Sequence, residues 1–273
     1  MTALYTSKII FICIVYYTSL NDRKCIYFYV FAFFQALVVF AVCLPLYKMA
    51  LLLLLGLLTV CAATPRDLSG KMFTFPQETN TAHVRLTASR QDLRAVTVCF
   101  RSFTELQRDH SLFSLATPSA ANDFLIFKSA ADGVIHVGAK QNGADISGQH
   151  YELNAWVSIC STWDAASGLV QVWIDGKPSS RIFVSSGSNI NGPIIIVLGQ
   201  EQDSHGGDFD VNQSFIGMMS DVHMWDYVVS PHEIQNYAHR FVGFTPGNVL
   251  NWRELEFQTV GRVLIEDEQW SIT

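Results

Sequence analysis

The sequence predicts an all-β fold, an antiparallel β-sandwich with one α-helix on a face. From residue 64 onward, many short runs alternate apolar and polar residues, as strands with one buried face do. Asp-Gly turn dipeptides at 132–133 and 175–176 separate several of these runs. A single segment, beginning at Ser230, has helical periodicity instead. Because many short strands with regular turns are typical of sandwiches, we expect one domain over residues 64–273.

The first 63 residues contain two apolar segments. Residues 26–47 carry no charge and are long enough to span a bilayer. Residues 49–63 have the form of a secretory signal, with a positive start, an apolar run and small residues at the end. Residues 1–48 are then either a membrane anchor or an upstream extension, with translation starting at Met49. We favour the extension because the signal after Met49 is complete by itself, and we expect a secreted, extracellular protein.

Cysteine usage supports export. Four of the six cysteines lie before residue 64, which leaves Cys99 and Cys160 in the domain. An even pair in an exported domain predicts one disulfide. The alternative is two buried free thiols.

The charge balance indicates which ligands suit this domain. The chain has a formal net charge of -6, and its first 63 residues hold an excess of basic side chains, so the domain is more acidic than the whole chain. An acidic surface disfavours nucleic acid as the primary ligand and disfavours anionic membranes, whereas it suits cations.

Five alternating or apolar runs predict strands at residues 95–103, 124–127, 134–138, 168–176 and 215–225. In the last of these we expect Ile216, Met218 and Met224 to share one face with Val222. Residues 193–199 form a continuous apolar run, which is typical of a strand buried on both sides.

One helix is predicted by its own start and stop signals. Residues 230–233 read Ser-Pro-His-Glu, a capping box with proline at the first helical position. Apolar residues then follow at helical spacing from Ile234 to Phe241, and Gly243 ends the pattern. The single apolar stripe predicts a helix that lies on one face of the sandwich.

The segment GQEQDSHGGDFDVNQSF, residues 199–215, gathers acidic and amide side chains without a lysine or arginine. Calcium takes about six to eight oxygen ligands from such groups. The glycine pair at 206–207 would let the chain fold back on itself and bring its two limbs together. Clustered carboxylates repel one another unless a cation neutralises them. The spacing matches no EF-hand, so the alternative is a solvated acidic loop.

The same segment contains the sequon Asn212-Gln213-Ser214, the single Asn-x-Ser/Thr sequence in the domain. A glycan there would crowd Gln213, so glycosylation and metal binding at Gln213 are competing interpretations.

Five blocks of the domain together resemble the pentraxins of the short type, the C-reactive protein and serum amyloid P type. The blocks are SICSTWDAASG (158–168), VWIDGKP (172–178), LGQEQDSHGGDF (198–209), MWDYVVSPHEI (224–234) and NVLNWRELEF (248–257). The pentraxin signature His-x-Cys-x-Ser/Thr-Trp-x-Ser/Thr keeps its centre from Cys160 to Trp163, whereas Ser158 and Ala165 replace its first and last residues. The resemblance implies a jelly-roll, concanavalin-like β-sandwich with one helix.

The resemblance also implies that each subunit binds two calcium ions. Its ligand set falls on Asn122, Glu201, Gln202, Asp203, Asp210 and Gln213. Glu201 and Asp203 would bridge both ions and Gln202 would offer its main-chain carbonyl. Asp210 and Gln213 would hold the second ion, with Asp210 shorter than the family's usual glutamate.

This sequence departs from the family at the ligands of the first ion. The family's Asp-Asn pair falls on Ala121 and Asn122, so the carboxylate is missing. Asp123 could replace it only if the loop shifts by one residue, because neighbouring residues of an extended chain point opposite ways.

In the family the calcium pair itself holds the ligand. A phosphate of phosphocholine or phosphoethanolamine bridges the metals, and carbohydrate is a further ligand class. The apolar residue that packs against the choline methyl groups falls on Phe127. The glutamate near the ammonium group falls nearest to Gln141 or Asp145.

The expected function is calcium-dependent pattern recognition in innate immunity, on microbial or damaged-cell surfaces and in the acute phase. The resemblance implies a homopentamer, whose repeated sites gain avidity, and complement and phagocyte receptors as partners. No catalytic role is expected. The alternatives are a membrane-anchored, lectin-like adhesion module and a jelly-roll glycosidase, but the Glu-x-Asp-x-Glu alternation that such a glycosidase needs does not occur.

Overall fold

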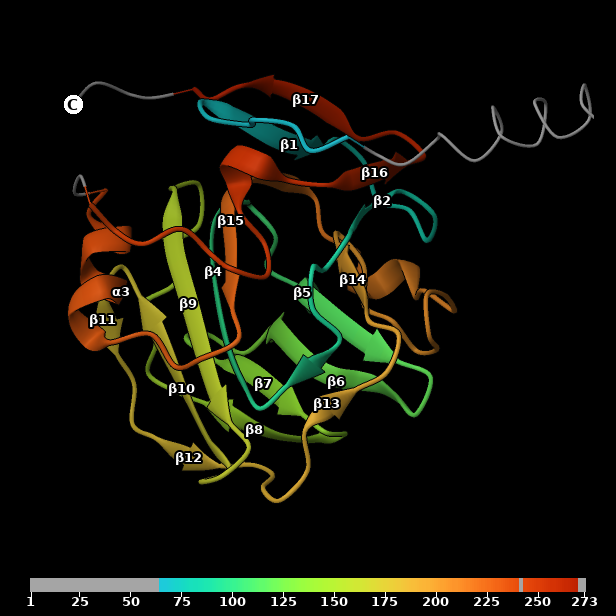
Figure 1. Cartoon of the computed structure of the whole chain (residues 1–273). Helices are drawn as coiled ribbons and strands as arrows, with labels where there is room; N and C mark the ends of the chain where they lie inside the picture. The colour runs from blue at the N-terminus through green and yellow to red at the C-terminus, as the bar shows by residue number, and fades with distance from the viewer. Residues whose placement is uncertain (1–63, 241–242, 270–273) are drawn as a thin grey trace, which may run out of the picture. The chain divides into compact units, whose positions relative to one another are not determined.

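The computed structural model describes residues 64–240 and 243–269, drawn in colour in Figure 1. They belong to one compact unit, Ala63–Thr273. Within these two ranges, none of the helices has the length and apolar character needed to cross a bilayer. The predictions for residues 1–48 and 49–63, an anchor or extension and a signal peptide, lie outside the described residues.

In the described residues, this unit consists of two large antiparallel sheets, a short strand pair and one α-helix. The first sheet has the order β11 (Lys177–Pro178), β10 (Leu169–Ile174), β9 (Val157–Asp164), β4 (Ala95–Phe103), β15 (Gly217–Trp225), β1 (Lys71–Phe75) and β17 (Leu264–Asp267), with β12 (Ile182–Phe183) beside β10. The second has the order β16 (Phe257–Val260), β2 (His83–Leu86), β14 (Ile195–Leu198), β5 (His110–Thr117), β6 (Ala120–Lys128), β7 (Ile135–Ala139) and β8 (Asn142–Ile146). A short pair joins β3 (Asp92–Leu93) to β13 (Ile190–Asn191). The predicted all-β, antiparallel sandwich is confirmed.

The inward faces of both sheets form one hydrophobic core. Val96, Val98 and Phe100 of β4 are fully buried in it, as the alternation predicts. β14 lies between β2 and β5 and is buried along its whole length, as its continuous apolar run predicts. Removing side chains of this kind from water, at roughly 25 cal/mol per Å² of apolar surface, is the main force that holds the two sheets together.

β15 differs from the prediction because of a bulge. The register of β15 against β4 shifts between Ser220 and His223, and Asp221 in between has a positive φ of 53°. A bulge changes which residues face inward. Met219 is therefore fully buried in the core, whereas Met218 is half-buried outside it.

Helix α3 (Pro231–Ala238) starts as predicted and ends early. The Ser230 hydroxyl accepts a hydrogen bond from the Glu233 N–H, and Pro231 occupies the first helical position. The Nη2 atom of Arg101 donates to the main-chain oxygens of Tyr237 and Ala238, at 3.0 and 2.9 Å, and so satisfies the last carbonyls of the helix. Phe241, which the helical pattern included, lies outside the described residues.

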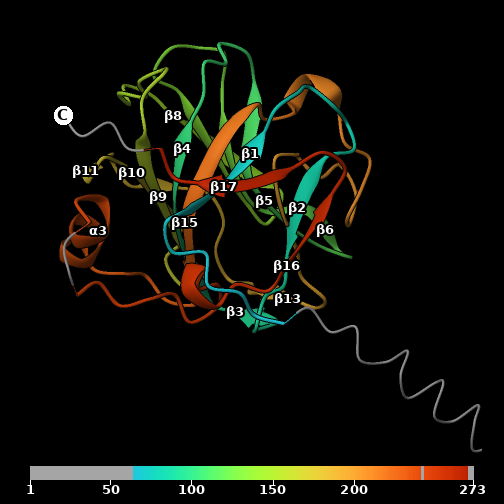
Figure 2. The same ribbon diagram turned by 90° about the horizontal axis from the view of Figure 1, so that it is seen from above.

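The predicted disulfide joins Cys99 and Cys160, which are 61 residues apart in the sequence, across a pair of adjacent strands. Cys99 of β4 lies opposite Cys160 of β9, and their sulfurs are 2.06 Å apart. This bridge packs with Trp225, Ile234 and Tyr237, so that α3 covers the first sheet over the disulfide. In both ribbon views α3 and the orange turn near residue 211 lie on opposite sides of the unit (Figures 1 and 2).

Two-residue turns with positive φ close one hairpin at an edge of each large sheet. Asp175 and Gly176, with φ of 47° and 74°, join β10 to β11 as predicted. Lys140 and Gln141, with φ of 54° and 66°, join β7 to β8 in the same way. This second tight turn was not predicted from the sequence, because neither residue is one of the Gly, Asn or Asp residues that such turns favour.

Candidate metal and ligand site

The acidic segment forms a folded-back loop between β14 and β15. Ser204 and Gly207 exchange both main-chain hydrogen bonds, each 3.3 Å long. Gly206 between them has a φ of 90°, a conformation that glycine adopts readily. The fold-back that the glycine pair predicts is therefore present, and it brings residues 201–203 beside residues 208–213.

The Gln202 side chain anchors the first limb of this loop. It is fully buried, and its Nε2 atom donates to the main-chain oxygens of Ser114 and Ile195, at 3.0 and 3.2 Å. Its Oε1 atom accepts from the Gly206 N–H at 3.0 Å. Because the side chain is used within the fold, the main-chain carbonyl is the group of Gln202 that could serve a cation, as the resemblance implies.

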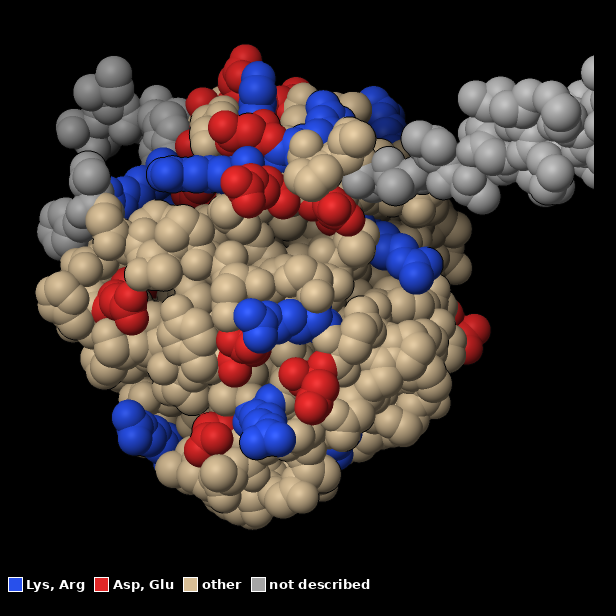
Figure 3. Space-filling view, viewed as in Figure 1, with Lys and Arg blue, Asp and Glu red and all other residues tan. Residues whose placement is uncertain are grey.

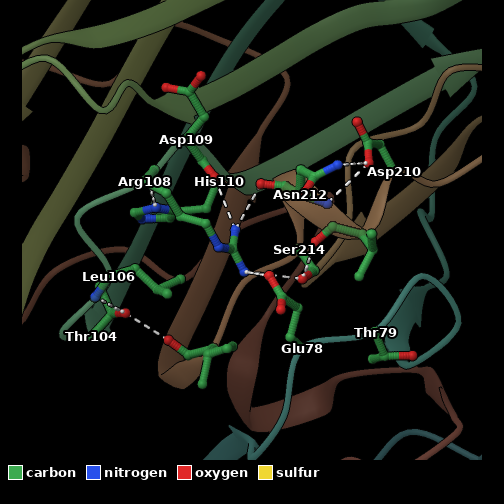
Figure 4. Close-up of polar contacts among 12 residues, drawn as sticks. Glu78, Thr79, Thr104, Leu106, Arg108, Asp109, His110, Asp210, Asn212 and Ser214 are labelled. Atoms are coloured by element: carbon green, nitrogen blue, oxygen red, sulfur yellow. Dashed lines mark hydrogen bonds and ion pairs between the residues drawn. The ribbon is translucent and has the colours of Figure 1, made fainter.

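Arg108, just before β5, anchors the second limb (Figure 4). Its guanidinium donates to the Asn212 main-chain oxygen at 2.9 Å and to the Ser214 hydroxyl at 3.2 Å. The same group lies 3.0 Å from a carboxylate oxygen of Glu78. Arg108 therefore ties down the backbone of the loop and pairs with a carboxylate outside it. Arg108 was not predicted as a site residue, because it lies far from the loop in the sequence.

The short 3-10 helix η1 (Val211–Gln213) fixes the residues of the second limb. Asp210 caps it, and the Oδ1 atom of Asp210 accepts from both the main-chain and the side-chain N–H of Asn212, at 2.9 Å each (Figure 4). One carboxylate oxygen of Asp210 is thus engaged in the cap.

Glu201 is the buried centre of the candidate site. It is 4% exposed, and this burial raises the pKa of its carboxyl group. A hydrogen bond from the Asn122 amide opposes the rise in pKa, whereas the negative charges of Asp203 and Asp210 add to it. The structure therefore brings four of the predicted ligands, from two distant parts of the chain, into one electrostatic cluster.

Three buried oxygens of the predicted ligand set have no hydrogen-bond partner among the described residues. They are Oδ1 of Asn122, Oε2 of Glu201 and Oε1 of Gln213. Leaving a buried acceptor unsatisfied costs about 1–3 kcal/mol, so native proteins seldom do it. All three atoms are hard oxygen acceptors of the kind that calcium prefers, and the residues present therefore fit that ion.

Carboxylates alone do not complete this site. Within residues 64–240 and 243–269, no three Asp, Glu, His or Cys side chains assemble into a metal centre. The amides of Asn122 and Gln213 and the carbonyl of Gln202 would have to supply the remaining ligands, in keeping with the mixed ligand sets of calcium.

Asp123 does not replace the carboxylate that is missing at Ala121. It is fully buried, its Oδ1 atom lies 2.9 Å from the Lys140 ammonium group, and its Oδ2 atom accepts from the Thr117 hydroxyl. The one-residue shift that would turn Asp123 toward the site is therefore not adopted, because Asp123 already neutralises Lys140.

A depression of about 240 Å³ adjoins Glu201 and Gln213. Phe127 and Leu125 contribute apolar surface to it, and His136 and Asp145 contribute polar groups. The Nδ1 atom of His136 lies 2.8 Å from Oδ1 of Asp145, its cross-strand neighbour. The depression thus offers apolar and acidic groups beside the candidate ligands.

The two positions considered for the family's acidic residue lie in different places. Asp145 lines the depression. Gln141 is exposed in the β7–β8 turn, where its main-chain N–H donates to the Asn122 carbonyl at 3.0 Å. Gln141 is therefore a neighbour of Asn122 outside the depression. Leu125 and His136 were missed, although the alternation of β6 and the pairing of Phe127 with His136 place them beside Phe127.

Two other parts of the described surface differ from this site. A larger depression, of about 350 Å³, lies on the first sheet around Trp173, Arg181 and Val228 and contains none of the candidate ligands. On the face seen in Figure 3, basic and acidic residues alternate around β17, and ion pairs such as Lys71–Asp267 lie there. That face therefore carries no uniformly basic patch of the kind that binds nucleic acid.

Known proteins resemble this chain in both sequence and architecture. A family model described as the Pentaxin family, the pentraxins, matches residues 71–267. The chain is 40% identical over 225 residues to a C-reactive protein of Sus scrofa, covering 82% of this chain and 98% of that protein. It is 38% identical over 206 residues to a serum amyloid P-component of Cavia porcellus, covering 75% of this chain and 90% of that protein.

A solved structure supports the same relationship. It is a heptameric SAP-like pentraxin from Limulus polyphemus, with a TM-score of 0.67 and 27% identity, covering 74% of this chain and 96% of that chain. The jelly-roll sandwich that the resemblance implies is therefore confirmed. With the family model matching well over half of its length, this chain belongs to the pentaxin family.

Proposed function

We propose that this chain is a secreted, calcium-dependent recognition protein for phosphate-bearing ligands on microbial or damaged-cell surfaces. Its membership of the pentaxin family supports a role in recognition and not in catalysis. The observation that carries this proposal is the set of three unpartnered buried oxygens around Glu201.

The proposed calcium site would hold two ions. Glu201 and Asp203 would serve both ions, and Gln202 would add its main-chain carbonyl. Asn122 would serve the first ion, which would bind more weakly because Ala121 offers no ligand. Asp210 and Gln213 would serve the second ion. A pair of divalent cations supplies positive charge and open coordination positions for the oxygens of a phosphate group.

The adjoining depression would then select what the phosphate carries. Phe127 and Leu125 offer an apolar surface for the methyl groups of choline, and Asp145 offers negative charge for an ammonium group. We therefore propose phosphocholine and phosphoethanolamine as the first ligands to test. Carbohydrate is the other ligand class, and the apolar side chains of Phe127 and Leu125 favour the choline type.

The test is chromatography of the full chain on immobilised phosphocholine and phosphoethanolamine with calcium present, followed by EDTA. We expect retention on at least one resin and release by EDTA. Asp203→Asn removes the bridging carboxylate, so it should pass through. Asp208→Asn is the matched control, because Asp208 is an exposed acid of the same loop whose φ of 57° asparagine tolerates well. Passage of the unmodified chain through both resins contradicts the ligand proposal, and retention of Asp203→Asn contradicts the metal assignment.

We further propose that the chain forms a cyclic homo-oligomer, a pentamer, and meets complement and phagocyte receptors. The Limulus relative is named as a heptamer, which supports assembly but not a particular ring size. Light scattering during gel filtration measures the ring size directly. N-terminal sequencing of the mature protein decides between a secreted form and the membrane-anchored adhesion module, since only the latter retains residues 1–48.

A further inference from the structure

Asn212, the first residue of the sequon Asn212-Gln213-Ser214, lies in η1, two residues after Asp210 and directly before Gln213. Asn212 is exposed, whereas the Oε1 atom of its neighbour Gln213 is buried. We infer that Asn212 carries an N-linked glycan, which stands at the rim of the candidate calcium site and screens it from large surfaces. This inference rests on the proposed function, because the modification requires passage through the secretory pathway.

The folded loop accommodates this modification at Asn212. In the transfer step, Nδ2 of Asn212 forms a bond to C1 of the first sugar of a lipid-pyrophosphate-linked oligosaccharide. The bond from C1 to the pyrophosphate oxygen breaks, Nδ2 loses one proton, and the lipid pyrophosphate leaves. One hydrogen remains on Nδ2, and it can still serve Oδ1 of Asp210, which lies 2.9 Å away. The cap of η1 therefore survives.

The backbone around the sequon is fixed independently of that side chain. Arg108 holds the Asn212 carbonyl, and it also donates to the hydroxyl of Ser214, which is fully buried. Since sugar transfer precedes folding, the hydroxyl is free at that stage and becomes part of the loop anchor afterwards. Figure 4 shows these contacts around Arg108 together with the cap formed by Asp210.

The structure also resolves the competition between glycan and metal that the sequence suggested. The glycan is attached to the exposed side chain of Asn212, whereas the Oε1 atom of Gln213, which would bind the cation, is buried. The two groups therefore occupy different space. A glycan at the rim leaves room for a small ligand but hinders a flat, extended surface that must approach all sites of an oligomer together.

The experiment uses the full chain produced in a mammalian secretory cell line restricted to high-mannose glycans. Medium and membrane fractions are both analysed, so that retention of the protein does not prevent the measurement. Peptide mass spectrometry after glycosidase treatment in heavy-oxygen water should label Asn212 as heavy aspartate. Asn212→Gln should lack the glycan, and Ser214→Thr should keep it because the sequon and the hydroxyl remain. An unmodified Asn212 in the unaltered chain overturns the inference.

Shielding is tested separately, on the native protein. An endoglycosidase that leaves one sugar on Asn212 removes the bulk of the glycan and keeps the Asp210 hydrogen bond. We expect binding to phosphatidylcholine vesicles in calcium to tighten several-fold, whereas affinity for free phosphocholine stays within about twofold. Unchanged vesicle binding overturns the shielding role. If both forms ignore phosphocholine while Asn212 is glycosylated, the proposed function fails and the modification stands.

Discussion

Asp123 and Glu201 are both buried carboxylates, and the fold neutralises them differently. Asp123 is fully buried against the Lys140 ammonium group at 2.9 Å and also accepts a hydrogen bond from Thr117. Glu201, at 4% exposure, has an amide partner in Asn122 and further acids nearby, but no cation among the described residues. Asp123 is therefore neutralised within the fold, whereas Glu201 has no neutralising partner among the described residues.

The largest expected effect comes from breaking the internal pair. Lys140→Met leaves Asp123 charged and unpaired in the interior, which should lower the free energy of unfolding by about 3–5 kcal/mol. Denaturant unfolding should show this loss equally with calcium and with EDTA, because the pair is structural. Adding Asp123→Asn to Lys140→Met should restore most of the stability. A loss confined to the calcium-loaded protein would show that Asp123 serves the metal site after all.

Glu201→Gln tests the second buried carboxylate, Glu201. Calcium at a hundredfold above its dissociation constant should stabilise the unaltered chain by about 2.7 kcal/mol. The variant should lose most of this gain, while in EDTA it should be at least as stable as the parent, because a buried charge without a partner is removed. Thermal unfolding with and without calcium measures both quantities. Asp208→Asn should keep the full gain, and a large loss of stability in EDTA for Glu201→Gln would contradict the comparison.

Arg108→Gln tests how the backbone of the acidic loop is held in place. Its effect on calcium binding should be smaller than that of Glu201→Gln. The substitution removes the hydrogen bonds to the Asn212 carbonyl and the Ser214 hydroxyl, each worth about 0.5–1.5 kcal/mol net or somewhat more for a charged donor. We expect weaker binding of the ion held by Asp210 and Gln213, with the other ion less affected. Calorimetric titration separates the two events.

Glu78→Gln is the matched control for Arg108→Gln. It removes only the exposed ion pair of Arg108, which contributes about 0–1 kcal/mol, and leaves both loop contacts in place. Equal weakening of both ions by Arg108→Gln would indicate general loosening of the fold rather than positioning of the second limb.

Features that depend on neighbouring residues could be predicted from the sequence, whereas features that depend on distant contacts could not. Alternating or apolar runs predicted β4, β6, β7, β10, β14 and β15, and the capping box predicted the start of α3, because these signals are local. The acidic composition of the loop pointed to Glu201 and Asp203, and the glycine pair predicted its fold-back. By contrast, the pairing of Asp123 with Lys140 and the anchoring by Arg108 depend on strand register and on contacts between distant segments. The bulge at Asp221 likewise shifted the face of β15 without a local signal. Asn122 was found only through the family resemblance.

The smallest expected effect is the pH dependence of the metal-free protein. Because burial raises the pKa of Glu201, the folded state holds its proton to higher pH than the unfolded state does. The contribution of Glu201 to stability should therefore fall as pH rises from the ordinary glutamate pKa through the raised value. Burial lowers the pKa of His110 to about 4 and of His223 to about 3, so these groups destabilise the fold as pH falls below about 6.5, the opposite trend. Subtracting the unfolding free energies of Glu201→Gln from those of the parent, both in EDTA, cancels the histidine contributions. A difference that grows in favour of the parent with rising pH would mean that the fold already neutralises Glu201 without calcium.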